Sequence, residues 1–222
     1  MDIYETVVRF FQTGGPFMYP IATVLVIGLA IAIERWVVLT LARRTNRRAF
    51  DTLMGQLREK NYQSVVAAGG DSRVPMNRIV AAGIARFTGS KRRDDIESAM
   101  EEGVLEALPR LEKRTPYLAT LANVATLLGL LGTIIGLIAA FTAVADAAPT
   151  EKASMLSSSI SVAMNTTAFG LISAIPLLLL HAVLQTKTTE IVDSLEMACV
   201  KVLNNLVDTD ALSGLTRDTD LA

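Results

Sequence analysis

Three long stretches without a charged side chain constrain this chain more than any other feature of its sequence. No Asp, Glu, Lys or Arg occurs in residues 10–33, 115–145 or 153–186. A helix needs about 20 residues to cross the hydrocarbon core of a bilayer, and each stretch is longer than that. Charged residues make up only 19% of the 222 residues. The sequence therefore predicts an all-α, polytopic membrane protein with three transmembrane helices.

Composition also argues against several functional classes. The formal net charge is −1, which leaves no global basic field for nucleic acid. One Cys, Cys199, and one His, His181, provide neither a disulfide framework nor a cysteine metal cluster within one chain. The sequence also lacks a glycine-rich phosphate loop. We therefore expect no enzyme, no catalytic residue and no bound metal.

The distribution of basic residues predicts the topology. Fifteen of the 21 Lys and Arg residues lie between Arg43 and Arg114, whereas the segment between the second and third uncharged stretches offers only Lys152. Basic residues close to span ends favour the cytoplasmic side. The N-terminus is then expected outside, the C-terminus inside, and the helices are expected to extend into the cytoplasm.

The segment boundaries follow from breaks in this pattern. Gly14, Gly15 and Pro16 interrupt the first stretch. Residues 1–16 have helical apolar spacing that fits an amphipathic surface helix, and a frayed terminus explains them equally well. The remaining segments are a first span at 17–41, a cytoplasmic helical loop at 42–114, a second span at 115–145, a short outer loop at 146–153, a third span at 154–186, a cytoplasmic helical extension at 187–207 and a polar tail at 208–222, which we expect to be disordered. Within the loop we expect helices at about 47–60, 76–88 and 94–112.

Polar residues follow two faces of the third span. One stripe combines Ser154, Ser158, Ser161 and Asn165, whereas Thr167 points nearly opposite, with Thr166 on a shoulder. Hydroxyls of this kind commonly bond back to their own helix and allow close packing. The amide of Asn165 needs partners beyond its helix, which leaves an interhelical bond and a water-filled path as equal alternatives.

The second span presents a complementary face of small residues, formed by Thr126, Gly129, Gly132, Thr133, Gly136 and Ala140. Such faces usually pack against a neighbouring backbone. Thr133 could instead present its oxygen to a passing ion, and the spacing does not separate the two. Pro176 removes one backbone hydrogen bond from the third span, which favours a packing kink.

The centres of all three spans contain no ionisable residue. Hydroxyls and carbonyls can line a path, but a proton relay ordinarily uses ionisable groups. Either nothing ionic crosses, or a partner provides the charge.

Two strings carry a resemblance to a known family. MNTTAFGLISAIP at 164–176 resembles the third-span signature of the MotA/TolQ/ExbB proton-channel family, and LGLLGTIIG at 128–136 resembles its second-span signature. Glu34 and Arg35, which close the first span, and the loop lengths extend the resemblance over nearly the whole chain. The loop between Arg43 and Arg114 is short, which favours the three-span ExbB/TolQ architecture over the four-span flagellar stators.

The resemblance implies a motor subunit of the bacterial inner membrane. Family members form a homopentamer around two single-span helices of the ExbD/TolR/MotB type, and the partner supplies an ion-binding Asp. Thr133 and Thr167 match threonines that line the ion path, and we expect Thr166 and Asn165 to line it as well. The glycines of both strings, including Gly170, and Pro176 are expected in helix packing. Beyond the transported H⁺ or Na⁺ and membrane lipid, no cofactor is implied.

One position departs from the ExbB and TolQ pattern. Those branches usually carry Glu five residues before the threonine, where this chain has Val162. The pair Thr166–Thr167 is instead similar to a pair in sodium-driven stators, and a hard cation prefers oxygen ligands. These features give a slight preference for sodium. A membrane scaffold without ion conduction is the alternative function.

Overall fold

The computed structural model describes the backbone of residues 11, 14–70, 72–90, 92–145 and 148–219, and side chains as far as residue 208. The regular structure in these residues is entirely helical. In chain order the helices are α2 (Met18–Arg58), α3 (Tyr62–Gly70), α4 (Pro75–Gly89), α5 (Arg93–Glu112), α6 (Thr115–Ala145) and α7 (Lys152–Thr219). The prediction of an all-α chain is confirmed.

Three helical stretches of the described residues are long and apolar enough to cross a membrane. They are Met18–Arg58, Arg93–Ala145 and Lys152–Asp208. Each contains one of the uncharged stretches in the sequence, so the prediction of three membrane-spanning helices is confirmed in length and composition. These helices support a multi-pass membrane protein.

The chain divides into two compact units, and the long helices α2 and α7 contribute to both. The first unit comprises residues up to Arg35 together with Arg114–Leu184, and the second comprises Trp36–Lys113 together with the chain from Gln185 onward. The first unit therefore holds the first two uncharged stretches and all but the last two residues of the third. The second holds the loop predicted to be helical.

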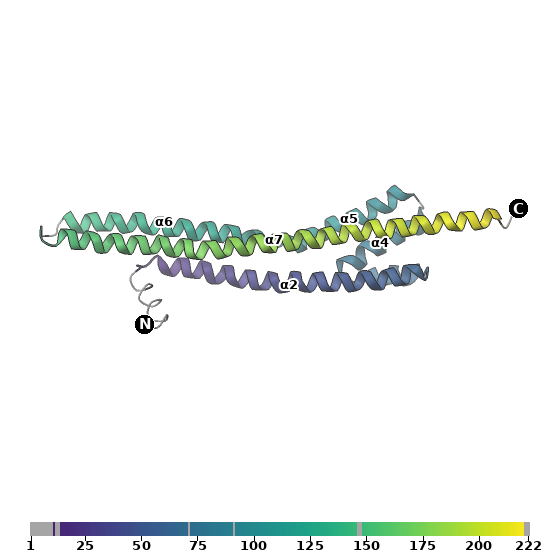
Figure 1. Cartoon of the computed structure of the whole chain (residues 1–222), viewed down its shortest axis with the longest axis horizontal. Helices are drawn as coiled ribbons and strands as arrows, with labels where there is room; N and C mark the ends of the chain where they lie inside the picture. Colours follow the sequence, from purple (N-terminus) through teal and green to yellow (C-terminus); the bar gives the residue numbers. More distant parts are fainter. Residues whose placement is uncertain (1–10, 12–13, 71, 91, 146–147, 220–222) are drawn as a thin grey trace. The chain divides into compact units, whose positions relative to one another are not determined.

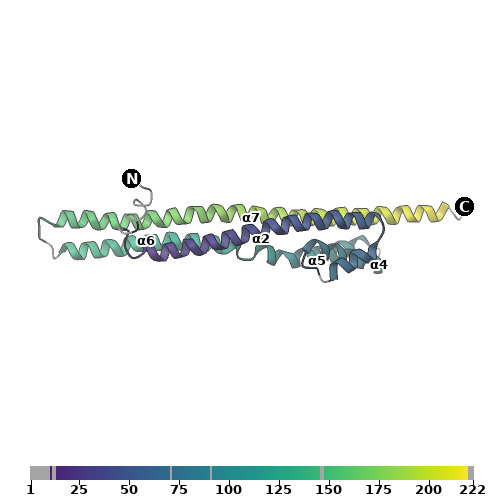
Figure 2. The same ribbon diagram turned by 90° about the horizontal axis from the view of Figure 1, so that it is seen from below.

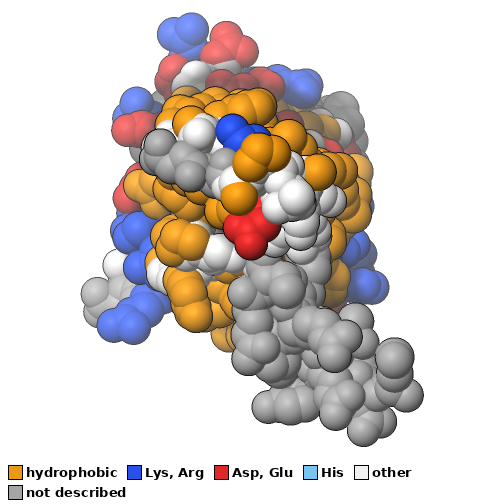
Figure 3. Space-filling view, turned by 90° about the vertical axis from the view of Figure 1, so that its left-hand side faces the viewer, with side chains coloured by type: hydrophobic (Ala, Val, Ile, Leu, Met, Phe, Trp, Pro, Cys, Tyr) orange, Lys and Arg blue, Asp and Glu red, His pale blue; other side chains and the backbone are white. Residues whose placement is uncertain are grey.

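In the first unit, α6 and the early part of α7 form an antiparallel hairpin, as two perpendicular views show (Figures 1 and 2). The buried positions in this unit include many small residues, and a small-residue face lets helices approach closely without a hydrophobic driving force. Large apolar side chains point outward instead, among them Leu127 and Ile138 of α6 and Leu179 of α7, each more than 60% exposed. Figure 3 shows many hydrophobic side chains on the described surface at the end where α6 and α7 meet. This surface is suited to lipid or to other apolar helices.

Polar contacts join the helices at the other end of the first unit. Arg114, just before α6, donates to the Glu34 carboxylate of α2 over 2.7 Å. His181 Nδ1 of α7 lies 3.1 Å from the Thr115 carbonyl oxygen. Because a carbonyl oxygen only accepts, that nitrogen carries the proton in this contact. The two contacts connect the start of α6 to both neighbouring helices.

The second unit has an ordinary apolar core around α4. Ile79, Ile84, Ile96 and Met100 are fully or almost fully buried. Gly83 and Gly103 admit the neighbouring helix, because a Cβ added at either would meet Met100 or Ile79 at 3.0 Å or less. A bidentate ion pair between Arg78 and Glu106 connects α4 to α5 at the surface.

Contacts between α2 and α7 complete the second unit. Arg43 of α2 pairs with Glu190 of α7 over 2.9 Å. Lys187 Nζ lies 3.1 Å from the centre of the Trp36 ring, in a cation–π arrangement.

The helices differ from the sequence-based boundaries in three places. The piece expected at 47–60 is the continuation of α2, which runs unbroken from Met18 to Arg58, because no proline follows its first turn. Helix α3 was not predicted; a reversal at Lys60, whose φ is 55°, separates it from α2. Helix α7 continues to Thr219, past the start of the expected disordered tail. Extending an existing helix is easier than starting one. Most of the expected amphipathic segment, 1–16, lies outside the described residues.

Two adjacent glycines of α3 allow a matched test of this packing. A Cβ at Gly69 would lie 2.1 Å from Ala81 Cβ, whereas a Cβ at Gly70 would meet nothing within 4 Å. We expect Gly69→Ala to lower the free energy of unfolding by about 1–3 kcal/mol through overpacking. Gly70→Ala should leave it unchanged or raise it by up to about 1 kcal/mol. Thermal unfolding of both variants in detergent measures the difference, and equal midpoints would contradict the observed α3–α4 contact.

Candidate functional site

The backbones of α6 and α7 approach each other closely near the middle of the hairpin. A Cβ on Gly129 would lie 3.3 Å from the Gly170 Cα, and a Cβ on Gly170 would lie 2.8 Å from the Ala125 carbonyl oxygen. Backbone atoms cannot rotate away as a side chain can. This separation of the helices therefore requires glycine at position 170 and leaves little room for a side chain at position 129.

Two threonine hydroxyls meet beside this crossing. Thr133 Oγ1 of α6 and Thr167 Oγ1 of α7 are in direct hydrogen-bonding contact. The Gly129 carbonyl oxygen lies 3.1 Å from the first and 3.0 Å from the second. The structure therefore brings together both residues that the family resemblance assigns to an ion path. We call Thr133, Thr167 and the Gly129 carbonyl the oxygen cluster.

The oxygen cluster is neutral and half-buried. Each hydroxyl has one proton and two lone pairs, so the three oxygens retain lone pairs after the two protons are used. Such oxygens suit a hard cation. A dehydrated cation also needs a compensating charge, because its transfer from water without one is very costly. The cluster can therefore contribute ligands or hydrogen bonds to an ion but cannot neutralise it.

Thr166 does not join the oxygen cluster. Its side chain is 3% exposed, and its hydroxyl lies 2.6 Å from the Gly14 carbonyl oxygen and 3.1 Å from the Val162 carbonyl oxygen. Successive residues of a helix are about 100° apart around its axis, because a turn has about 3.6 residues. The hydroxyls of Thr166 and Thr167 consequently contact different neighbours.

The remaining predicted positions lie around these contacts. Asn165 is half-buried, and its amide forms no hydrogen bond with another residue in the described part of the chain. Gly132 lies against the Thr166 methyl group and Phe17, and Gly136 lies against Ala163. Pro176 lies inside α7 and is exposed in the single chain.

The sequence interpretation missed the part of this site that precedes α2. It treated Gly14 and its neighbours only as a helix break, whereas the Gly14 carbonyl accepts a hydrogen bond from Thr166. Phe11 also packs edge-on against Phe169, with ring centroids 5.0 Å apart. The glycines and Pro16 were the only signal in the sequence, since they mark a turn whose carbonyls cannot all find helical donors.

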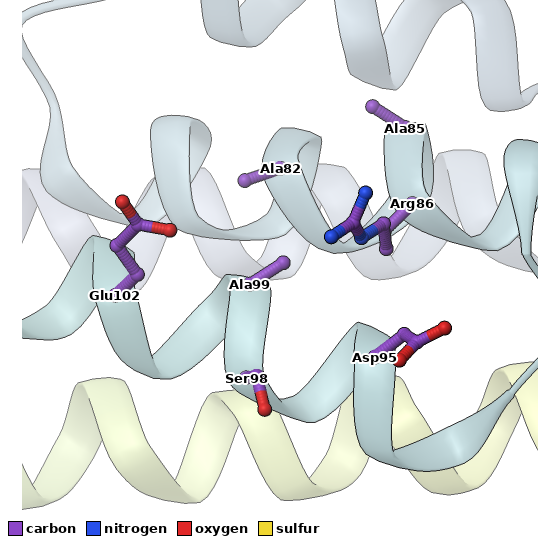
Figure 4. Close-up of a pocket in the computed structure, with 7 residues that line it drawn as sticks. All are labelled: Ala82, Ala85, Arg86, Asp95, Ser98, Ala99 and Glu102. Atoms are coloured by element: carbon purple, nitrogen blue, oxygen red, sulfur yellow. The ribbon is translucent and has the colours of Figure 1, made fainter.

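One of the pockets in the second unit is a second candidate. It lies between α4 and α5, and Figure 4 shows its three charged side chains among small ones. Its Asp95 carboxylate accepts a hydrogen bond from Ser90 over 2.7 Å. The lining residues are Ala82, Ala85, Arg86, Asp95, Ser98, Ala99 and Glu102. None is a nucleophile beside a histidine or cysteine, so the oxygen cluster is the stronger candidate.

The fold and the oxygen cluster define a helical, multi-pass membrane protein with polar groups at a helix crossing. A model of the MotA/TolQ/ExbB proton channel family matches residues 71–197, more than half of the chain, and the matched region includes the oxygen cluster. The chain belongs to this family, whose members are associated with channels and transport.

Three relatives agree with this assignment. A biopolymer transport protein ExbB homolog of Methanothermobacter thermautotrophicus is 26% identical over 92% of this chain and 71% of its own length. The Tol-Pal system protein TolQ of Haemophilus influenzae is 31% identical over 68% of this chain and 70% of its own. A biopolymer transport protein ExbB-like 3 of Synechocystis is 30% identical over 76% of this chain and 80% of its own length.

A double-mutant cycle tests the contact between the two threonines. Thr133→Val and Thr167→Val each remove one hydroxyl and keep the branched shape. We expect the two changes to be non-additive by about 0.5–1 kcal/mol in the free energy of unfolding, because they remove a shared interhelical hydrogen bond. Thr142→Val provides the control, since the Thr142 hydroxyl donates to the Ile138 carbonyl of its own helix and to no other helix among the described residues. Additive effects of Thr133→Val and Thr167→Val on the free energy of unfolding would contradict the contact.

Proposed function

We propose that this chain is the ion-conducting subunit of a rotary motor in the bacterial inner membrane, which couples proton or sodium flow to mechanical work. The oxygen cluster at the α6–α7 crossing is the observation on which this proposal rests. The family is one of proton channels, and relatives are named as biopolymer transport and Tol-Pal system proteins. These names support an energy-transducing membrane subunit.

A partner chain supplies the charge that the oxygen cluster lacks. The span centres of this chain contain no ionisable residue, and a cation in hydrocarbon requires one nearby. We infer that a single-span ExbD/TolR-like protein places an Asp carboxylate close to Thr133 and Thr167. The carboxylate then binds the ion transiently while the threonine oxygens replace part of its water shell.

The proposed assembly is a homopentamer around two partner helices. The outward apolar side chains of α6 and α7 in the first unit offer surfaces for neighbouring copies and for lipid. The N-terminus lies in the periplasm and the C-terminus in the cytoplasm, in agreement with the basic residues between Arg43 and Arg114. Residues 1–16 and 146–153 are then periplasmic.

The energy for movement comes from the membrane potential. One elementary charge crossing 100 mV releases about 2.3 kcal/mol, so several transfers supply enough energy for a rotation step. Five copies and two partner helices cannot occupy equivalent positions. The two partner helices therefore face different surroundings within the five copies. Ion binding at one partner helix changes which of its orientations is more stable, and the helices rotate relative to the surrounding copies.

Removing the Thr167 hydroxyl tests the proposed path. We expect Thr167→Val to lower ion flux through the complex about tenfold or more, because one oxygen ligand is lost at a dehydrated step, while the complex still assembles. Flux is measured in proteoliposomes that contain this chain and its partner, and Thr142→Val is the matched control. Unchanged flux in Thr167→Val would remove this residue from the path. If the wild-type complex passes no ion, the scaffold function is favoured instead.

The identity of the ion requires its own measurement. The Thr166–Thr167 pair gives the sequence a slight preference for sodium, although only Thr167 contributes to the oxygen cluster. We expect flux in the reconstituted complex to rise with external sodium at constant pH. Replacement of sodium by choline should then abolish it. Flux that follows the pH gradient and ignores sodium would identify the proton as the coupling ion.

A further inference from the structure

The turn before α2 leaves one backbone carbonyl without a helical donor. Met18 N–H donates to the Gly15 carbonyl over 3.2 Å, and Tyr19 N–H donates to the Pro16 carbonyl over 3.4 Å. Pro16 has no N–H, and Gly15 has a φ of 75°, which reverses the chain. As a result, no backbone N–H of the following described residues reaches the carbonyl of Gly14, which is buried.

The Thr166 hydroxyl satisfies this carbonyl from a position 152 residues further along the chain. The separation is 2.6 Å, shorter than the 3.1 Å to Val162 in its own helix. A hydroxyl has a single proton, so the shorter contact with Gly14 is the favoured one. An unsatisfied carbonyl in an apolar environment is unfavourable, and this hydrogen bond satisfies it.

The other side of Thr166 is also enclosed. Its methyl group faces Gly132, where an added Cβ would lie only 2.5 Å away, and Phe17 approaches the same glycine at 3.2 Å. The side chain is thus held between the turn before α2, helix α6 and its own helix. The only proton of its hydroxyl is used in the bond to Gly14, so Thr166 has none to donate to the oxygen cluster.

We propose that Thr166 is a positioning residue, which fastens the turn at Gly14–Phe17 to α7 and thereby holds Thr167 against Thr133. The two threonines are adjacent, so fixing one on the α2 side fixes the rotation of α7 that directs the other towards α6. This assignment separates Thr166 from the ion path, in contrast to the role implied by the family resemblance. Gly14 precedes the region matched by the family model, so the contact reaches beyond that region.

Two variants of Thr166 separate the hydrogen bond from simple packing. Thr166→Val keeps the branched shape and removes the hydroxyl, whereas Thr166→Ser keeps the hydroxyl and removes the methyl group. We expect Thr166→Val to raise amide hydrogen exchange about tenfold at the non-proline residues of 14–21, because one buried hydrogen bond is lost. Thr166→Ser and the control Thr142→Val should exchange like the wild type.

This exchange measurement uses the whole complex and does not depend on ion transport. Unchanged exchange in Thr166→Val would overturn the proposal. Faster exchange in Thr166→Ser with normal exchange in Thr166→Val would also overturn it, because that pattern identifies packing of the methyl group as the only role.

Flux measurements separate positioning from ion binding, and this part rests on the proposed function. A positioning residue affects how often the path is correctly assembled, so we expect Thr166→Val to lower maximal flux about tenfold. The cation concentration that gives half-maximal flux should stay within about twofold of the wild type, and Thr166→Ser should restore the flux. A rise of about tenfold in that concentration, without a fall in maximal flux, would make Thr166 an ion ligand and overturn the proposal. If the wild-type complex conducts no ion, the proposed function fails, whereas the exchange result still decides the role of Thr166.

Discussion

The close approach of two backbones at Gly129 and Gly170 is the constraint on which the rest of the first unit depends. Between lipid-exposed helices the hydrophobic effect offers no net attraction, so packing distance and polar contacts decide association. A Cβ on Gly170 would collide with the Ala125 carbonyl. Only at this short separation can the Thr133 and Thr167 hydroxyls contact each other and share the Gly129 carbonyl. The glycines thus determine the geometry of the oxygens without contributing a side chain.

The threonine hydroxyls at and beside the α6–α7 crossing are satisfied locally, which stabilises the crossing without any charged group. The oxygen cluster bonds within itself, and Thr166 bonds to the Gly14 carbonyl. None of these groups is charged. A hairpin of this kind is stable in hydrocarbon when no ion is present, but it attracts a cation only weakly. In the complex that we propose, a carboxylate from another chain would change that balance, because it would supply the charge while the oxygens remain as ligands.

The sequence predicts the helices well, because uncharged stretches and helical spacing are local properties. It does not predict the full length of α2 or the presence of α3, since cooperative extension and a single reversed residue decide those boundaries. The family resemblance implied that Thr133 and Thr167 line one ion path, whereas the spacing around Thr133 did not separate packing from ion contact. Their direct contact comes from the structure. The contact between Thr166 and Gly14 spans 152 residues, and no periodicity in either segment indicates it.

The different surroundings of Thr166 and Thr167 bear on how a hydroxyl pair should be interpreted in a helix of this family. Two adjacent threonines offer two oxygens in sequence, which favours a sodium site when only the composition is considered. In three dimensions their directions differ by about 100°, so a common ion requires a distorted helix or a neighbouring chain. The described helix is regular through both residues. Under the proposed function, ion preference therefore depends on the oxygens that Thr167 meets on α6 and on the partner's carboxylate, whereas the proposed role of Thr166 is to hold that arrangement in place.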